Sequence, residues 1–310
     1  MKDVYICGDV NIDLLIPNVN KMPAGGQELV VDNMYTAIGG GAALTALGLA
    51  KLGISVDFEG NIHSDMYGDY IVSEFKKAGV GIKHLHFSEK NKTGISLSFT
   101  NKDDRGFITY RGTNSEIDLS SVSVEHAKES KFMHVTGYCG EKHDKYLDLL
   151  KRVKKAGVKV SFDLGWDDSG LWYRGITELF EYIDVLFMNE TEILHYSGCE
   201  TLDEAIARFK RDDMILAVKC GKDGSVACRG AELVKRSGLK VKAVDTTGAG
   251  DSFNAGFLCG VLNGLSLSDC LMYGNITGAM SVTAYGGNTA FPDKDTLLKI
   301  YEKETRGAKP

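Results

Sequence analysis

The stretch AVDTTGAGDSFNAGF, residues 243–257, is the most informative part of this sequence. Three small residues, Gly248-Ala249-Gly250, precede an apolar run, and the pattern predicts a helix that begins at the glycines and ends near residue 263. The first turn of a helix has unpaired backbone N–H groups and the positive end of the helix dipole. Glycines at that position let a ligand approach the backbone closely. The stretch therefore predicts an anion-binding site.

A carboxylate, Asp251, stands at the mouth of this predicted anion site. It would repel a phosphate, so its presence needs a chemical reason. Phosphoryl transfer supplies one, because an aspartate can accept the proton of the attacking hydroxyl while backbone N–H groups hold the phosphate oxygens. We expect the helix dipole to keep Asp251 ionised, so that it acts through position rather than through a raised pKa. The alternative, that Asp251 and Ser252 merely cap a helix, explains less of the run from Asp245 to Asp251.

Short apolar runs alternate with helical patterns through the rest of the chain. Strands are predicted at 4–8, 55–59, 132–136, 159–163, 185–188, 215–219 and 225–228, and helices near 41–52, 67–78, 142–156 and 203–211. This alternation predicts an α/β fold with a mostly parallel sheet covered by helices on both faces.

Two segments, 12–36 and 92–112, interrupt this rhythm with period-2 alternation and no helix between strands. They are predicted to be antiparallel β pieces inserted into a single α/β domain that spans residues 1–310. They are too small to bury a core of their own, so we expect them to form a lid over a site at the strand ends. The same lid could pair with its counterpart in a second subunit and give a homodimer.

The composition argues against several function classes. Hydrophobic residues make up 43% of the 310-residue chain and charged residues 25%, as in ordinary globular proteins. The net charge is -6 and the densest basic run, 151–155, lies on an amphipathic helix pattern, which argues against nucleic acid as a partner. The chain contains no GxxxxGKS or GxxxxGKT sequence, so it is not a P-loop protein.

The cysteines and the N-terminus bear on the cellular compartment. The seven cysteines are odd in number, irregularly spaced and mostly set in apolar runs, which indicates free thiols in a reducing compartment. Residues 1–3 lead directly into a strand pattern without an apolar signal segment. The longest weakly polar stretch, 37–50, is too short to span a bilayer. We therefore expect a cytoplasmic protein without membrane association.

The run from Asp245 to Asp251 resembles the C-terminal signature of the PfkB, or ribokinase-like, carbohydrate kinases. The resemblance extends to the segments GDVNID (8–13), GGGAA (39–43), NETE (189–192) and KCGKDG (219–224). It covers nearly the whole chain. It implies the doubly wound ribokinase-like fold with a small β lid, and ATP-dependent phosphorylation of a sugar hydroxyl.

The resemblance also implies a set of site residues. Asp251 is implied as the general base, and the N–H groups of Gly248, Ala249 and Gly250 as the anion hole. Substrate contacts are implied for Asn11, Asp13, Gly39, Gly40, Leu44 and Arg111, and ATP contacts for Asn189, Lys219, Gly221, Gly224 and Asn275. Glu192 is implied to act on Mg²⁺ through water, and Asp245 and Thr247 to form a candidate site for a monovalent cation such as K⁺.

Two positions depart from the common family pattern. Leu44 stands where many members carry an asparagine that binds sugar hydroxyls, so we expect the acceptor to lack that hydroxyl or to satisfy it elsewhere. The alternative is that Leu44 faces the core and the alignment is off by one. The segment DLGWD (163–167) replaces the Asp-Pro-Asn-x-Arg pattern of many sugar-acid and fructose kinases. Sugar, sugar-acid and nucleoside acceptors all remain open.

Two other classes of function were weighed. The Gly248-x-Gly250 turn is similar to the start of the GxGxxG motif of dinucleotide-dependent oxidoreductases. However, Phe253 stands where the third glycine of that motif belongs, and Asp251 would have no chemical role in such an enzyme. A non-catalytic sugar or nucleotide sensor could keep the fold, but it would have no need of the base. A nucleoside kinase of the same fold is the remaining alternative.

Overall fold

The computed structural model describes residues 1–19, 21–100, 105–167 and 169–306. Within them, nine strands form one large sheet in the order β13-β12-β11-β10-β9-β8-β1-β4-β5. Neighbours from β11 to β5 are parallel, and β12 and β13 add an antiparallel edge. The strands are β1 (Lys2–Cys7), β4 (Val56–His63), β5 (Gly81–Ser88), β8 (Ser130–Thr136), β9 (Lys159–Asp163), β10 (Val185–Asn189), β11 (Ile215–Lys219), β12 (Ser225–Arg229) and β13 (Glu232–Arg236).

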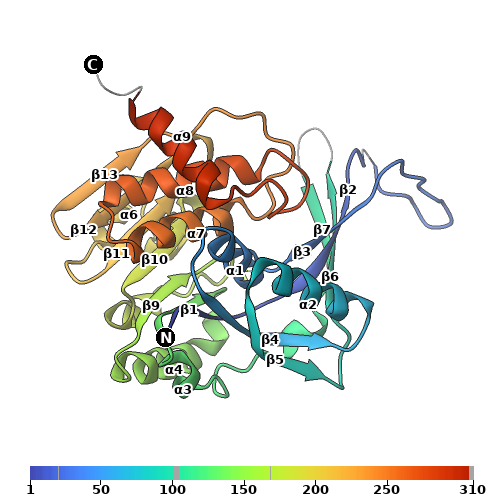
Figure 1. Ribbon diagram of the computed structural model, residues 1–310, viewed down its shortest axis with the longest axis horizontal. Helices are drawn as coiled ribbons and strands as arrows, with labels where there is room; N and C mark the ends of the chain where they lie inside the picture. Colours follow the sequence, from blue (N-terminus) through green and yellow to red (C-terminus); the bar gives the residue numbers. More distant parts are fainter. Residues whose placement is uncertain (20, 101–104, 168, 307–310) are drawn as a thin grey trace.

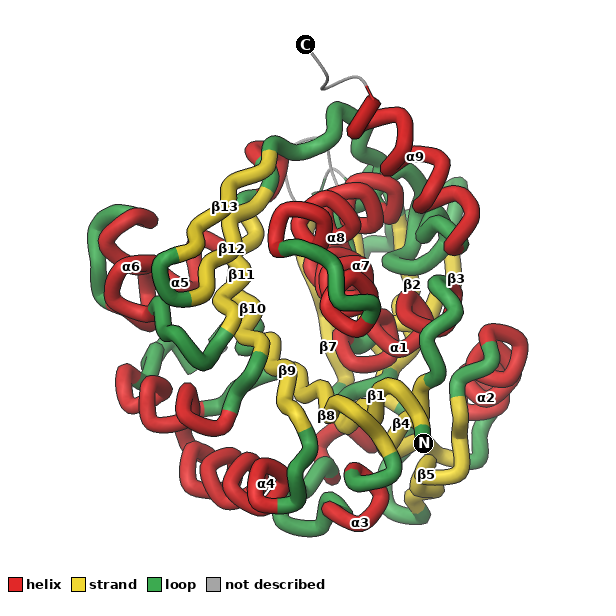
Figure 2. Tube along the Cα trace, turned by 60° about the vertical axis from the view of Figure 1, so that its left-hand side comes forward, coloured by secondary structure: helices red, strands yellow, loops and turns green. Residues whose placement is uncertain are grey.

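Helices cover both faces of this sheet (Figure 2). One face carries α1 (Gly41–Lys51), α2 (Met66–Ala78), α7 (Ala249–Leu262), α8 (Leu267–Ser281) and α9 (Lys294–Arg306). The other carries α3 (Val124–Ala127), α4 (His143–Lys155), α5 (Glu190–Ser197), α6 (Leu202–Phe209) and the 3-10 segment η3 (Arg174–Tyr182). Because side chains alternate along a strand, Val4 and Ile6 enter the first core, and Tyr5 and Cys7 the second.

A second, smaller sheet stands beside the large one (Figure 1). Its order is β3 (Tyr35–Gly39), β2 (Asn11–Ile16), β6 (Gly94–Thr100) and β7 (Arg105–Tyr110). The expectation of purely antiparallel pieces is wrong, because β2 and β6 pair in parallel. Each follows a parallel strand of the large sheet, β1 or β5, and so leaves it in the same direction. The predicted bounds of 12–36 were also too wide, since residues 21–34 form no strand and are exposed.

The predicted strands and helices are confirmed, most of them within one or two residues at each end. Six further elements were not predicted from the sequence: β5, β13, α3, α5, α8 and α9. All seven cysteines are free, and Cys7, Cys228, Cys259 and Cys270 are buried. Among the described helices, none is long and apolar enough to cross a membrane.

Candidate active site

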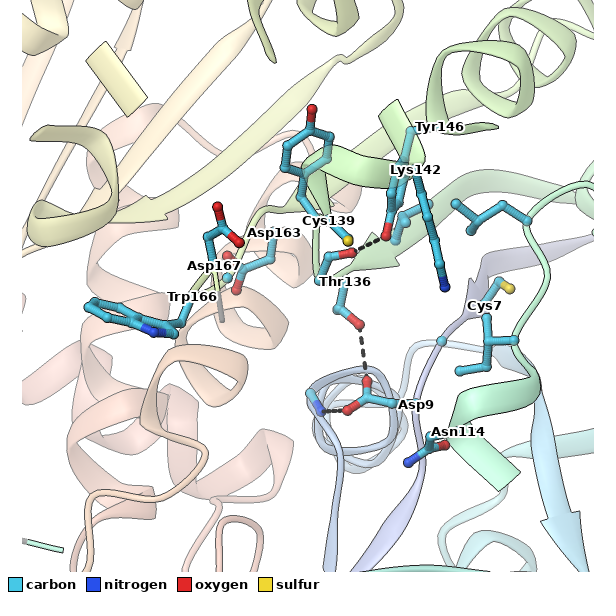
Figure 3. Close-up of a pocket in the computed structure, with 18 of the residues that line it drawn as sticks. Cys7, Asp9, Asn114, Thr136, Cys139, Lys142, Tyr146, Asp163, Trp166 and Asp167 are labelled. Atoms are coloured by element: carbon cyan, nitrogen blue, oxygen red, sulfur yellow. Dashed lines mark hydrogen bonds between the residues drawn. The ribbon is translucent and has the colours of Figure 1, made fainter. Parts of the chain in front are cut away.

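The large sheet has a topological switch point between β1 and β8. From β1 the chain winds outward to β4 and β5, and it then returns to β8 and continues in the other direction. Ligands of open α/β sheets bind outside the carboxyl ends of the strands at such a point. A cavity of about 670 Å³ lies there, lined by the ends of β1, β8 and β9 and by residues from α1, α7 and the small sheet side (Figure 3). We call it the switch-point cavity.

A second cavity, of about 470 Å³, is lined by residues of the segments 219–224, 238–253 and 274–282, six of which are glycines. We call it the glycine-lined cavity. The two cavities meet at the N-terminus of α7, because Asp251 lines the first, and Ala249 and Gly250 line the second. The predicted anion site therefore lies between two cavities rather than in one.

The loop before α7 has a fixed conformation. Gly248 has φ 71° and caps the helix, and a Cβ there would lie 2.7 Å from Leu44 Cδ1. Asp245 accepts hydrogen bonds from the backbone N–H of Thr247 at 3.0 Å and of Gly286 at 3.0 Å. Position 248 therefore requires a glycine, because its backbone is left-handed and Leu44 leaves no room for a side chain.

Asp251 lies in the first turn of α7, directly against the start of α1. A Cβ at Gly41 would be 2.8 Å from Asp251 Oδ1, so the glycine leaves room for the carboxylate. Burial raises the pKa of Asp251 to about 7, and the nearby Asp163 adds to the shift while Lys219 opposes it. The expectation that Asp251 keeps an ordinary pKa is therefore wrong. The helix dipole is outweighed by desolvation and by a second carboxylate.

An ion pair connects the walls of the two cavities. Lys219 Nζ donates to Asp163 Oδ2 at 2.7 Å, and Asn254 Nδ2 donates to the same oxygen. Asp163 lines the switch-point cavity and Lys219 the glycine-lined cavity. Burial alone would lower the pKa of Lys219, but the carboxylates of Asp163 and Glu192 outweigh it and raise that pKa. The lysine therefore stays charged beside the N-terminus of α7.

Asn189 and Glu192 form a capping box at the start of α5. Glu192 accepts from the Asn189 backbone N–H at 2.8 Å and from its Nδ2 at 2.7 Å, and the Asn189 side chain accepts from the Glu192 N–H at 2.8 Å. Glu192 is buried, and burial raises its pKa. Asn189 pairs in register with Lys219 across β10 and β11. Neither Asn189 nor Glu192 is among the described residues that line the two cavities.

The residues predicted from the first strands to contact substrate divide into two groups. Asn11 and Asp13 are buried and joined by a hydrogen bond of 2.8 Å, outside the lining of the switch-point cavity. Gly39 leaves room for both, because a Cβ there would lie 2.1 Å from Asp13 Oδ1. Burial raises the pKa of Asp13 to about 7, and Asp9 and Asp245 raise it further against the hydrogen bond from Asn11. Of these three carboxylates Asp9 lines the switch-point cavity, whereas Asp13 and Asp245 are buried outside its lining.

The other predicted substrate residues lie closer to the cavity. Gly40 has φ 93°, and a Cβ there would lie 2.6 Å from the carbonyl oxygen of Asp9. Arg111 lines the cavity together with Asn114, whose Oδ1 accepts from the Val10 N–H at 3.1 Å. These residues fix the backbone around the start of α1.

Leu44 is buried in α1, with 2% of its surface exposed. Its Cδ1 would lie 2.7 Å from a Cβ at Gly248 and 2.8 Å from a Cβ at Gly287, so it packs under the loop before α7. It is not one of the residues lining the switch-point cavity as described. This position favours the alternative in which Leu44 is a packing residue.

The residues predicted to bind ATP gather in the glycine-lined cavity, with Asn189 as the exception. Lys219, Gly221, Gly224 and Asn275 line it. Gly224 has φ 102°, and a Cβ there would lie 2.0 Å from the Arg236 carbonyl oxygen. Asn275 accepts from Ser225 Oγ at 2.8 Å and donates to the Ser237 carbonyl oxygen at 3.2 Å, so it holds the adjoining turn in place.

Three residues of the candidate site were not predicted from the sequence, namely Asp9, Asp163 and Asn254. Asp9 accepts from the N–H groups of Gly41 and Ala42 at 3.1 Å and caps α1 (Figure 3). Asp9 and Asp163 come at or directly after the carboxyl ends of predicted strands. That position was the available signal, because the carboxyl ends of parallel strands meet at one edge of the sheet. Nothing in the sequence singles out Asn254, three residues after Asp251.

Comparisons with known proteins agree with this arrangement. The model of the pfkB family carbohydrate kinases matches residues 1–294. A Bacillus subtilis (strain 168) protein named 2-dehydro-3-deoxygluconokinase is 29% identical over 287 residues, 87% of this chain and 88% of the relative. The structure of Arabidopsis thaliana ribokinase complexed with ribose and ATP has a TM-score of 0.83 and 24% identity, covering 97% of this chain and 99% of the other. The Methanocaldococcus jannaschii nucleoside kinase has a TM-score of 0.80 and 26% identity, covering 98% and 99%.

Proposed function

The chain belongs to the pfkB family of carbohydrate kinases, and from that premise we propose that it transfers the γ-phosphoryl group of ATP to a hydroxyl of a sugar or sugar-like molecule. One observation carries the proposal. Two cavities meet at the N-terminus of α7, with Asp251 in one and Ala249 and Gly250 in the other. An acceptor and a phosphate donor bound in the two cavities would face each other across an anion site.

Asp251 acts as the general base. It takes the proton of the acceptor hydroxyl as the new O–P bond forms and the bond between the γ-phosphorus and the bridging oxygen breaks, which releases ADP. The N–H groups of Gly248, Ala249 and Gly250 hold the oxygens of the transferring group. Lys219 places a positive charge next to Gly250, since a Cβ at that glycine would lie 3.3 Å from Lys219 Nζ. A fixed cation and fixed N–H groups need no reorganisation as charge develops.

ATP fits the glycine-lined cavity. Gly221 and Gly224 would let the nucleotide approach the backbone, and Asn275 holds the adjoining turn through its hydrogen bond to the Ser237 carbonyl oxygen. Mg²⁺ offsets the negative charge of the phosphates when it is bound with ATP. The oxygen-rich Asn189–Glu192 box suits a hydrated Mg²⁺, because both side chains are committed to each other and reach a metal only through water. The box lies next to Lys219 across β10 and β11.

Glu192→Gln tests the proposed metal role. Glutamine keeps one acceptor oxygen for the Asn189 N–H but loses the acceptor for Asn189 Nδ2, so the melting temperature should fall modestly while the protein stays folded. The Mg²⁺ concentration at half-maximal rate should rise several-fold, since a neutral amide holds the hydration shell less strongly than a carboxylate. An unchanged Mg²⁺ titration would remove Glu192 from this role. Glu204→Gln, in the equivalent capping box of α6, is the matched control.

We also propose a monovalent cation site at Asp245 and Thr247. The Asp245 carboxylate is buried in the loop before α7, where its charge is held by hydrogen bonds from Thr247 and Gly286. K⁺ bound there would stabilise the loop that carries the anion hole. Replacing K⁺ by tetramethylammonium should then raise the KM for ATP, whereas an equal rate in both salts would argue against the site.

The small sheet fits the role of a lid and of a dimer contact. It stands beside the switch-point cavity, and its strand β7 exposes the apolar side chains of Phe107, Ile108 and Tyr110, while the segment before β3 exposes Val30 and Met34. A second copy could cover these side chains by pairing with the same sheet. Light scattering that shows only monomer at micromolar concentration would contradict this pairing. A cytoplasmic location fits the use of ATP and the free thiols.

The proposal is tested by ADP release across a panel of sugars, sugar acids and nucleosides. The panel covers the acceptors named by the relatives, a dehydrodeoxygluconate and ribose, and also nucleosides. Saturable, Mg²⁺-dependent ADP release with at least one acceptor is expected, with the phosphorylated product identified by mass spectrometry. Binding of ATP and acceptor without turnover would support the sensor alternative.

A further inference from the structure

Most carboxylates that line the switch-point cavity already have partners within the protein. Asp9 accepts from the backbone at the start of α1 at 3.1 Å. Asp163 pairs with Lys219 at 2.7 Å. Asp167 accepts from the loop that follows it, including the Trp172 N–H at 2.7 Å. These negative charges are therefore used in holding the walls of the cavity together.

Lys142 differs from them. It ends the 3-10 turn η2 (Gly140–Lys142) just before α4, and its side chain points into the cavity (Figure 3). Nζ forms no ion pair or hydrogen bond with any described residue, its neighbour Glu141 included. By contrast, Lys145 one turn later pairs with Asp118 at 3.1 Å. Lys142 is exposed at the edge of the cavity, so its ammonium is free to pair with a negative charge on a ligand that binds there.

A second cation, Arg111, lines the same cavity and comes from a different segment of the chain. Arg111 precedes the 3-10 turn η1 (Gly112–Glu116), which follows the last strand of the small sheet. Lys142 and Arg111 therefore bring positive charge to the cavity from two separate segments. Guanidinium and ammonium groups both form charge-assisted hydrogen bonds with carboxylates.

We propose that the acceptor carries a carboxylate that Lys142 binds, so that the substrate is a sugar acid rather than a neutral sugar. This inference rests on the proposed kinase function and names its substrate class. Arg111 already interacts with another group of the protein, so Lys142 is the cation of this lining that has no partner among the described residues. One positive charge matches a carboxylate better than the roughly two negative charges of a phosphate monoester. The hydroxyl to be phosphorylated then faces Asp251, whose own charge would repel the carboxylate and so helps to fix the orientation.

The test compares matched acceptors and matched variants. Gluconate and 2-dehydro-3-deoxygluconate are the anionic probes, glucitol and fructose the neutral ones, and fructose 6-phosphate the phosphate probe. Lys142→Met removes the charge and keeps most of the stem, Lys142→Arg keeps the charge, and Lys145→Met is the control on the same helix. The wild type should prefer a sugar acid. In Lys142→Met the KM for that acid should rise on the order of 10- to 100-fold, the usual worth of a charge-assisted hydrogen bond.

The other readouts separate this role from a structural one. In Lys142→Met the KM for ATP and the KM for any neutral acceptor should stay the same, and Lys142→Arg should restore most of the affinity for the acid. Calorimetry of the sugar acid with Asp251→Asn, with and without Lys142→Met, measures binding independently of turnover. Preference of the wild type for a neutral sugar, or equal binding of the acid by both proteins, would overturn the inference and leave the kinase assignment standing. Preference for fructose 6-phosphate would overturn the choice of carboxylate. Absence of ADP release with every acceptor would count against the proposed function itself.

Discussion

The two cavities that meet at α7 are lined by different kinds of residues. Six of the residues that line the glycine-lined cavity are glycines, and four of these lie in the short segments 219–224 and 274–278. The switch-point cavity is formed by side chains from the ends of β1, β8 and β9 and from the turns η1 and η2. A site in which the ligand approaches the backbone closely needs glycines at fixed positions, and it therefore leaves a motif in the sequence. A site made of side chains from scattered strand ends leaves none.

The largest effect is expected from the residue that separates the two cavities. Asp251→Asn should lower kcat by roughly 10²–10⁴, the usual worth of a positioned general base. ATP binding, measured by calorimetry, should stay within about twofold, because Asp251 lines the acceptor side only. Asp144→Asn, an exposed aspartate in the first turn of α4, is the matched control. Wild-type turnover by Asp251→Asn on its best acceptor would refute the assignment.

A smaller effect, on one cavity alone, is expected from Gly224. A Cβ at this position would lie 2.0 Å from the Arg236 carbonyl oxygen, and φ is 102°. Gly224→Ala should therefore shift the turn that lines the nucleotide side and raise the KM for ATP about tenfold, with little change in the KM for the acceptor. Gly264→Ala, with φ 69° and nothing within 4 Å, carries the same kind of backbone strain away from both cavities. Equal kinetics of the two variants would mean that the glycine-lined cavity does not hold ATP.

The same difference explains how much the sequence could predict. The helix that begins at the Gly248–Gly250 turn and the parallel sheet were predicted, because each depends on local pattern. Some residues of the glycine-lined cavity, such as Lys219 and Gly224, were implied by the resemblance to the family. Asp163 and Lys142 were not predicted, since their roles depend on which strand ends the topology brings together. Asp13 was predicted to contact substrate but lies buried beside Asn11. A family motif identifies such a residue without fixing the direction of its side chain.

Two helices and one strand illustrate the limits within the fold. Helix α8 is largely buried, because small residues such as Gly274 and Thr277 let it pack closely against α7. It therefore lacks a polar face, and its sequence shows little helical periodicity of apolar residues. Helix α5 has eight residues and follows β10 without a loop. Strand β5 carries Lys83, His84 and His86 in an edge position, where polar residues are tolerated.

The pH dependence of kcat reports the ionisation of Asp251 and Asp163, the two carboxylates that lie close together at the switch-point cavity. A base must be ionised, so kcat should fall as the pH drops through the raised pKa of Asp251, about 7. In Asp163→Asn the acidic limb should move to lower pH, because a nearby negative charge is removed while Lys219 keeps its positive charge. Asp118→Asn, on the surface, should leave the limb in place. An identical limb in Asp163→Asn and the wild type would show that the two carboxylates do not interact.

The smallest effect concerns stability, and its sign follows from the same pKa. The folded-state pKa of Asp251, about 7, exceeds the ordinary aspartate value of 3.8, so folding favours the protonated form. The favourable contribution is fully present below about pH 4 and is lost as the pH rises through about 7. Asparagine has no charge to bury, so Asp251→Asn should melt at a higher temperature than the wild type, by about 2–5 °C at pH 8 and by less at pH 5. Differential scanning fluorimetry of the wild type, Asp251→Asn and Asp144→Asn at both pH values measures this difference. A constant difference at pH 5 and pH 8, or a lower melting temperature for Asp251→Asn at pH 8, would mean that Asp251 is stabilised as an anion in the folded state. The helix dipole would then dominate over burial, and the acidic limb of kcat would have to come from another group.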